Sequence, residues 1–230
     1  TTSDGLYSHS EGWSTLSIGI GSHSEGGVFG GFYGTYTGGT SFGLGSHSEG
    51  SWTLSYGETS HAEGWNTTST GWGSHSEGES TESQGDSSHS EGIETITLGY
   101  GSHSEGYQTS ATTDYSHSEG ELTITQGDSS HSEGYKTSAT TKYSHSEGDS
   151  TRTGGNFLSI ASHSEGGYTV TGEDFTYPLP TKDPDISVGQ YSHSEGYYTS
   201  AYGGASHAEG ISTKSEGRGS HSEGSITLAY

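Results

Sequence analysis

The chain contains no cysteine and no methionine, only three prolines, and only six lysine and arginine residues against 29 aspartate and glutamate residues. No stretch approaches the roughly 20 apolar residues of a membrane-spanning helix, so we expect no membrane insertion in this segment. The formal net charge is -23. Because the few cations are scattered, nucleic-acid binding has no electrostatic basis, and we expect no nucleic-acid partner.

Apolar residues are also scarce, at 23% of the chain. Together with the acidic charge, this content is typical of disordered chains. A strict repeat argues against disorder: all fourteen histidines occur in the motif Ser-His-Ser/Ala-Glu-Gly, and the commonest spacing between them is fourteen residues. Self-similarity at a fixed period indicates a solenoid, in which small residues fill a narrow interior and glycine occupies the corners.

Each period divides into two heptads, so each coil is expected to hold two short strands. Side chains alternate between the two faces of a strand. Counting from the motif serine, the small residues at positions one, three, eight and ten share the inside, as Ser8, Ser10, Thr15 and Ser17 illustrate. Their hydroxyls would pair with one another or with the backbone. The sequence therefore predicts an all-β parallel β-solenoid with fourteen-residue coils and almost no helix.

The two outward faces differ. Positions nine and eleven vary freely, as Leu16 and Ile18 in one coil and Lys214 and Glu216 in another show, which is the behaviour of a solvent face. Positions two and four are His and Glu in every copy, so this face meets the same environment at every level, as a subunit interface along a fibre would supply. The predicted interface residues are His9, Glu11, His23, Glu25, His47, Glu49, His61, Glu63, His75, Glu77, His89, Glu91, His103, Glu105, His117, Glu119, His131, Glu133, His145, Glu147, His163, Glu165, His193, Glu195, His207, Glu209, His221 and Glu223.

The heptad Ser-x-Ala-x-Gly-x-x, most literal at residues 60–64 and 206–210, resembles the head repeat of trimeric autotransporter adhesins (YadA-like), which also occurs in bacteriophage tail fibres. The resemblance implies a left-handed parallel β-roll and a homotrimer packed about a common axis. That family commonly carries aliphatic residues at positions two and four. Here His and Glu stand at those positions, so a polar interface must replace the apolar one.

A polar interface of this kind requires paired charges, because an unpaired buried carboxylate is costly. A His of one chain donating to the Glu of the next would satisfy both groups, and the carboxylates would raise the pKa of the histidines. Such pairing predicts maximal stability at mildly acidic pH. The alternative is an exposed His/Glu face that serves only as a folding repeat.

Metal binding is a second reading of the same residues, since His and Glu two positions apart lie on one face of a strand. No resident cofactor is expected, because hydrogen-bonded His and Glu need no ion. Catalysis is disfavoured too: fourteen equivalent copies leave no special environment for an acid or base, and no P-loop, nucleophile elbow or zinc signature is present. The candidate metal ladder is His61, Glu63, His75, Glu77, His89 and Glu91.

Three intervals between histidines, of 24, 18 and 30 residues, exceed the period by 10, 4 and 16. We expect a single repeat domain over residues 1–230, a fragment of a longer fibre, with insertions near 30–39, 155–158 and 172–186. Insertions in solenoids become loops, which often bind partners, and aromatic rings with polar tips suit saccharide or protein contacts. The candidate receptor-binding residues are Phe32, Tyr33, Tyr36, Phe175 and Tyr177.

These features favour a non-enzymatic segment of an extracellular trimeric fibre, either a phage tail fibre or a bacterial surface adhesin, whose inserted loops contact a cell-surface glycan or protein receptor. One alternative is a self-associating extracellular filament with glycosylated Ser/Thr-rich faces. Another is an ice-binding solenoid. Ice binding needs an outward threonine array, and the regular threonine column at position eight points inward by phase.

Overall fold

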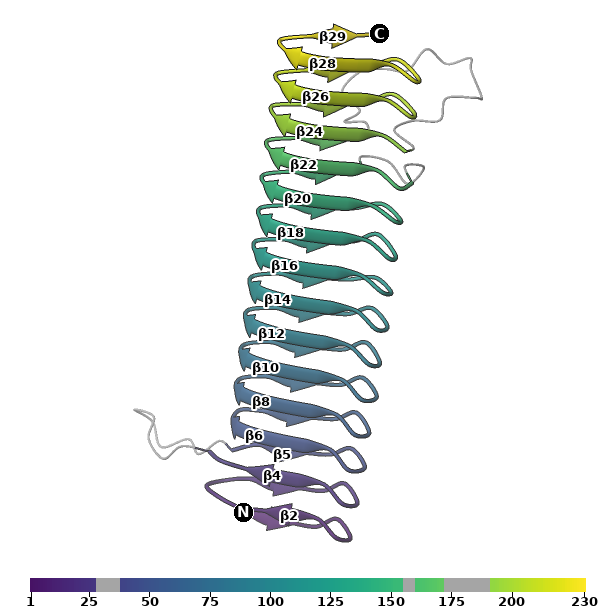
Figure 1. The fold of residues 1–230 in the computed structure, drawn as a ribbon. Helices are drawn as coiled ribbons and strands as arrows, with labels where there is room; N and C mark the ends of the chain where they lie inside the picture. The colour runs from purple at the N-terminus through teal and green to yellow at the C-terminus, as the bar shows by residue number, and fades with distance from the viewer. Residues whose placement is uncertain (28–37, 155–159, 172–190) are drawn as a thin grey trace, which may run out of the picture. The chain divides into compact units, whose positions relative to one another are not determined.

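The computed structural model describes residues 1–27, 38–154, 160–171 and 191–230, and in these ranges the chain is an all-β parallel β-solenoid (Figure 1). It has about fourteen coils. The described residues contain no helix. The prediction of a solenoid with almost no helix is therefore confirmed. By its contacts the chain divides into two compact units, Thr1–Tyr115 and Ser116–Tyr230, and each is a stack of coils.

In the first unit, each full coil contributes one longer strand and one two-residue strand to two separate sheets. The longer strands, of which the first has only two residues, are β2 (His9–Ser10), β4 (His23–Glu25), β6 (His47–Ser51), β8 (His61–Trp65), β10 (His75–Glu79), β12 (His89–Ile93) and β14 (His103–Tyr107). The short strands are β1 (Thr2–Ser3), β3 (Leu16–Ser17), β5 (Thr40–Ser41), β7 (Leu54–Ser55), β9 (Thr68–Ser69), β11 (Glu82–Ser83), β13 (Ile96–Thr97) and β15 (Ser110–Ala111).

The second unit repeats this arrangement. Its longer strands are β16 (His117–Glu121), β18 (His131–Tyr135), β20 (His145–Asp149), β22 (His163–Gly167), β24 (His193–Tyr197), β26 (His207–Ile211) and β28 (His221–Ser225). Its short strands are β17 (Ile124–Thr125), β19 (Ser138–Ala139), β21 (Arg152–Thr153), β23 (Val170–Thr171), β25 (Ser200–Ala201), β27 (Lys214–Ser215) and β29 (Leu228–Ala229).

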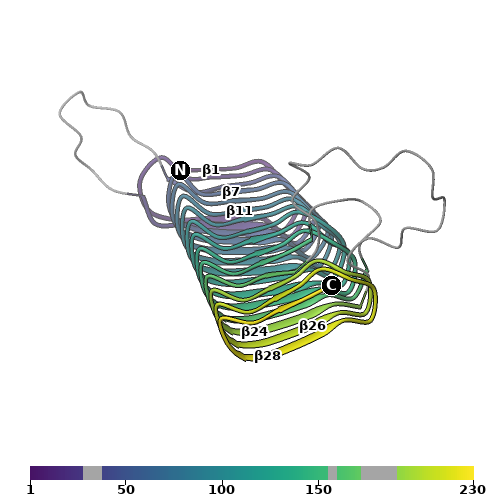
Figure 2. The same ribbon diagram turned by 90° about the horizontal axis from the view of Figure 1, so that it is seen from above.

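Within each unit the coils stack in register, so that equivalent residues pair across adjacent strands. His75 pairs with His89, and Glu77 pairs with Glu91. The register also survives the three long intervals, since β4 pairs with β6, β20 with β22, and β22 with β24 through their motif residues. Seen from above, successive coils of a unit overlie one another (Figure 2). The strands on either side of each long interval therefore keep the register of the repeat.

The interior contains small side chains almost exclusively. Among the described residues, the only buried apolar side chains are Ala62, Ala111, Ala139, Ala201 and Ala208, and the rest of the core is serine and threonine. Many hydroxyls pair with one another or with backbone carbonyls, as the sequence predicts: Ser10 Oγ lies 2.8 Å from Thr15 Oγ1, and Ser8 Oγ donates to the carbonyl of Gly5 at 2.7 Å. Other buried hydroxyls, such as that of Thr67, have no hydrogen-bond partner. Small hydroxyl side chains, rather than apolar ones, therefore fill this core.

The narrow core predicts how substitutions of the buried Ser76 change the free energy of unfolding. The Oγ of Ser76 donates to the carbonyl of Thr68 at 2.8 Å, and the equivalent position holds alanine at Ala62 and Ala208. We expect Ser76→Ala to lower the free energy of unfolding by about 1 kcal/mol or less. Ser76→Leu should cost more than about 3 kcal/mol, because the narrow interior has no room for the larger side chain. Chemical denaturation measures both, and equal losses would contradict this account of the core.

The corners depend on left-handed backbone, and glycine supplies only part of it. The motif glycine at position five has φ near +115°, as at Gly78, and a Cβ there would lie 2.0 Å from the carbonyl oxygen of Gly92 in the next coil. Positions seven and fourteen are also left-handed, yet they hold residues such as Asn66 (φ 57°) and Tyr115 (φ 56°). The expectation of glycine at every corner is therefore wrong at these two positions, where outward side chains have space.

Candidate functional site

The His and Glu side chains of the motif lie side by side on the outer face of the longer strands. Between them, the motif serine or alanine at position three points inward and is fully buried in most coils, as at Ser76 and Ser90. The alternation of strand faces therefore places every motif His and Glu on one side of each unit. We call the two columns together the His/Glu ladder. All fourteen pairs named in the sequence analysis belong to it and lie within the described residues.

The imidazoles of the ladder stack on one another. In the first unit, the ring centroids of His47 and His61 are 4.6 Å apart and those of His61 and His75 are 4.7 Å apart, with interplanar angles of 7° and 6°. In the second unit, His145 and His163 stack at 4.8 Å. This spacing follows from the separation of hydrogen-bonded strands, about 4.8 Å. Each inner imidazole is thereby half-buried by its neighbours, and the side chain of His61 is 33% exposed.

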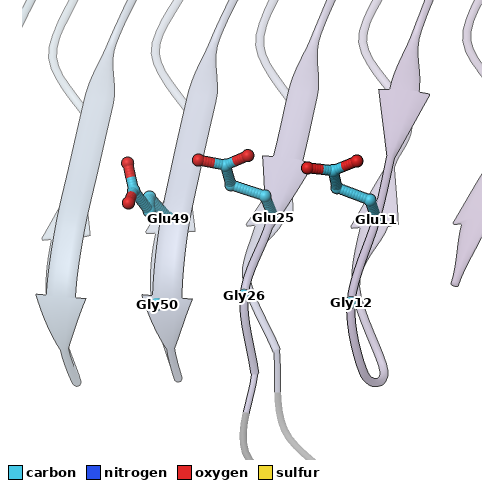
Figure 3. Close-up of a pocket in the computed structure, with 6 residues that line it drawn as sticks. All are labelled: Glu11, Gly12, Glu25, Gly26, Glu49 and Gly50. Carbon is cyan, nitrogen blue, oxygen red and sulfur yellow. The ribbon is translucent and has the colours of Figure 1, made fainter.

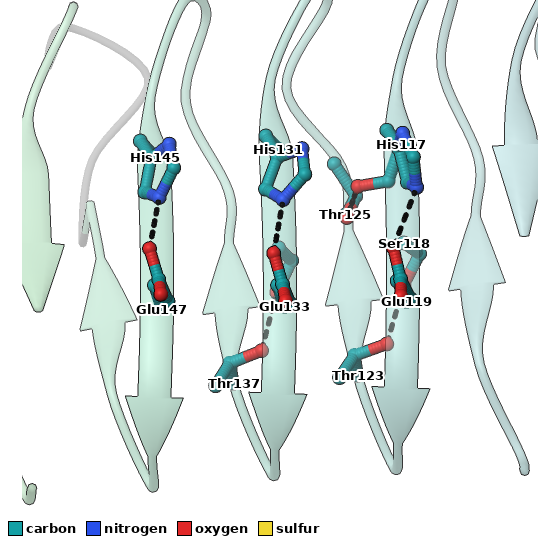
Figure 4. Close-up of polar contacts among 11 residues, drawn as sticks. His117, Ser118, Glu119, Thr123, Thr125, His131, Glu133, Thr137, His145 and Glu147 are labelled. Carbon is teal, nitrogen blue, oxygen red and sulfur yellow. Dashed lines mark hydrogen bonds and ion pairs between the residues drawn. The ribbon is translucent and has the colours of Figure 1, made fainter. Parts of the chain in front are cut away.

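Each His also lies beside the Glu of its own coil. In the second unit, Nε2 of His145 is 3.2 Å from Oε2 of Glu147, and the corresponding distance for His131 and Glu133 is 3.4 Å (Figure 4). In the first unit the separation is 3.9 Å at His61 and 4.0 Å at His75. The sequence analysis placed these pairs between chains. The structure forms them within one chain, because residues two apart on one strand face are already within reach.

The pKa values of four ladder histidines are lowered, opposite to the sequence prediction. Burial, with the neighbouring imidazoles of His75 and His47, lowers the pKa of His61 from 6.5 to about 4. Burial also lowers the pKa of His89, His131 and His163, and adjacent histidines add to the effect. The prediction of raised values is therefore wrong for these four residues. It considered the Glu partners and omitted the imidazoles stacked above and below.

Beside the carboxylate column, the first unit has a shallow open hollow. Glu11, Glu25 and Glu49 line it together with the motif glycines of the same coils, Gly12, Gly26 and Gly50 (Figure 3). The glycines lack side chains because the next coil lies too close, and this leaves space next to three carboxylates at successive levels. The hollow concentrates negative charge without a neighbouring lysine or arginine among its lining residues.

Comparison with known proteins adds no assignment. No family model and no curated protein matches the chain. Across the described ranges, no helix has the length and apolar character required to cross a membrane. The candidate receptor-binding residues Phe32, Tyr33, Tyr36, Phe175 and Tyr177 lie outside the described residues.

The predicted metal ladder is brought together only in part. Among the described residues, donor atoms of three groups lie within 4.8 Å of one another: His9, Glu11 and His23; His47, Glu49 and His61; and His61, Glu63 and His75. The sequence analysis named the third group. Glu77, His89 and Glu91 form no such group, and the rings of His75 and His89 are tilted by 40°.

Aromatic side chains also gather at one corner of the second unit, a feature that sequence reasoning missed. The rings of Tyr168 and Tyr198 stack at 5.0 Å, and Tyr197 meets Tyr198 edge-on at 4.4 Å. These residues occupy positions six and seven of successive coils. The sequence analysis did not predict whether side chains at these positions point inward or outward. Tyrosine at position seven of both neighbouring periods, next to a tyrosine at position six of the second, is the signal that would have predicted the cluster.

Proposed function

We propose that this chain is a structural segment of an extracellular fibre, and that copies of the chain associate through the His/Glu ladder. The observation that carries the proposal is the recurrence of the His/Glu pair in all fourteen copies of the motif, while positions nine and eleven vary. A surface that faces only solvent tolerates different residues from one motif to the next. A surface that contacts a partner with the same repeat requires the same residue pair in each motif.

The period of the ladder favours a second copy of the chain as the partner. In each unit the imidazoles recur about every 4.8 Å, as His89 and His103 do at 4.9 Å. A partner that meets equivalent groups at every level must carry the same spacing. A second copy of the chain has the same spacing, and its imidazoles and carboxylates can pair with the carboxylates and imidazoles of the first copy. Three copies is the number that the resemblance to trimeric adhesin heads implies.

A fibre role also agrees with the composition of the core. The interior is lined by Ser and Thr side chains, many of which hydrogen-bond to one another or to the backbone, so the coil can repeat without a growing apolar core. The threonines of position eight, including Thr67, Thr81 and Thr95, are fully buried. This column therefore offers no outward array to an ice surface, and we do not propose ice binding.

Charge reversal on the ladder tests the proposal. We expect Glu91→Arg/Glu105→Arg to weaken self-association by at least tenfold, since losing a hydrogen bond to a charged carboxylate costs about 1.5–3 kcal/mol. The matched control is Glu58→Arg/Glu82→Arg, which makes the same charge change at a corner and on the opposite face. Sedimentation equilibrium of wild type and both variants reports the number of chains.

A wild-type protein that sediments as a single chain at all accessible concentrations would overturn the proposal. Equal weakening by the two variants would show that the ladder is not the contact surface. An assembly of two chains, or an open-ended one, would retain the ladder contact and replace the trimer by a dimer or a filament.

A further inference from the structure

We propose that the His/Glu ladder of the first unit binds zinc-like divalent transition-metal ions. The best-formed site is at His61, which belongs to two donor groups: one with His47 and Glu49, and one with Glu63 and His75. All donors belong to one chain. The inference therefore goes beyond the proposed fibre role and does not depend on the association of chains.

Donor geometry is the first argument. In each of the two groups, two imidazole nitrogens and one carboxylate oxygen lie within 4.8 Å of one another. Zinc binds imidazole nitrogen at about 2.0–2.1 Å and carboxylate oxygen at about 2.0–2.2 Å, so two donors of one tetrahedral ion lie about 3.4 Å apart. Nε2 of His61 and Oε2 of Glu63 are 3.9 Å apart. The rings of His47 and His61 are parallel and 4.6 Å apart, so both must turn toward a shared ion, and the soft terminal torsion of His permits this turn.

Unsatisfied nitrogen atoms are the second, independent argument. The Nε2 atoms of His47, His61 and His75 are buried from solvent and have no hydrogen-bond partner. A buried polar atom without a partner is costly, and most such atoms in folded proteins are satisfied. The distance of 3.9 Å from His61 Nε2 to Glu63 Oε2 is too long for a hydrogen bond. It suits an ion placed between the two atoms.

The donor set selects the class of ion. Two imidazoles and one carboxylate are borderline donors that suit zinc, copper, nickel and cobalt better than calcium or magnesium, which prefer oxygen alone. Zinc accepts three protein donors in a tetrahedral arrangement and leaves the fourth position to water. The neighbouring carboxylates, including Glu49, Glu25 and Glu11 along the hollow, add an attractive field for a cation.

Sharing of His61 limits occupancy. One Nε2 atom binds one ion, so the two groups that contain His61 hold a single ion between them, and the group of His9, Glu11 and His23 holds a second. Removal of the carboxylates next to His61 should therefore delete one ion and leave the other in place. This gives the site a stoichiometric signature.

The test is calorimetric titration of the full chain with zinc chloride. The ladder variant is Glu49→Gln/Glu63→Gln, which keeps side-chain size and the stacked imidazoles. The control is Glu58→Gln/Glu82→Gln, which removes the same charge away from the ladder. We expect the ladder variant to bind one equivalent fewer, or to bind that equivalent more than about tenfold more weakly. The control should match wild type.

Zinc binding that is absent from wild type, or unchanged in the ladder variant, would overturn the inference. X-ray absorption of the wild-type protein with one equivalent of zinc provides a second measurement that needs no variant. Imidazole scattering around the ion supports the site, whereas an all-oxygen environment without imidazole overturns it. Far-ultraviolet circular dichroism checks that both variants keep the fold.

Discussion

Replacement of Gly78 by alanine is expected to lower the free energy of unfolding by more than about 3 kcal/mol. Gly78 has φ +115°, a region that L side chains rarely adopt, and an added Cβ would lie 2.0 Å from the carbonyl oxygen of Gly92. The obstacle is backbone of the next coil, so neither a rotamer change nor a neighbouring side chain can relieve it. The coils around residue 78 must separate or shift.

Gly73→Ala is the matched control for this prediction. Gly73 is also left-handed, at φ +59°, but its added Cβ would meet nothing closer than 3.7 Å. The equivalent position of the next coil already holds Ser87 at φ 57°. We expect a loss of about 1 kcal/mol, the usual cost of left-handed backbone for alanine. Denaturant unfolding of both variants measures the difference, and similar losses would refute crowding as the reason for the motif glycine.

Acidification from pH 7 to pH 4 is expected to destabilise the solenoid. The pKa of His61 falls from 6.5 to about 4 on folding, because burial and the imidazoles of His47 and His75 disfavour its charged form. Between these two pH values the unfolded chain binds a proton that the folded chain does not. The stabilisation is therefore complete above pH 6.5 and is lost as pH falls toward 4. His61 alone should contribute about 1 kcal/mol or more after allowance for solvent screening.

The groups around His61 set the sign of this effect. Two imidazoles of adjacent coils oppose protonation, and the carboxylate of Glu63, 3.9 Å from Nε2, favours it. Thermal melting from pH 7 to pH 4, with chelator present to remove metal ions, measures the profile. His61→Gln removes one titrating group and should flatten it. A melting temperature that rises on acidification would instead match the raised pKa values expected from His–Glu pairing between chains.

The period, the two strands per coil and the inward positions could be predicted from the sequence because a solenoid repeats local contacts. Ser76 and Ser90 are fourteen residues apart, and their strands pair directly. A fixed spacing in the sequence therefore becomes a fixed spacing in space. The same logic identified the outward His and Glu, since alternation along a strand follows from the backbone alone.

Two features could not be predicted in this way: which carboxylate each imidazole contacts, and which non-glycine residues have a positive φ. The pattern places His61 on the same face as Glu63 and does not show whether the imidazole meets its own carboxylate or another chain's. The residue types at Asn66 and Tyr115 do not reveal their left-handed φ, because any residue whose side chain points into open space tolerates this conformation at modest cost.

By itself, the sequence determined the coil, its register and the columns of like residues, because each of these depends on a period that every motif repeats. Tertiary structure alone decided which charges interact. Stacking about 4.8 Å apart brings His47, His61 and His75 into a column whose members desolvate one another. Burial and like-charge repulsion there outweigh the attraction of Glu63, and that balance depends on distances in space rather than on spacing along the chain.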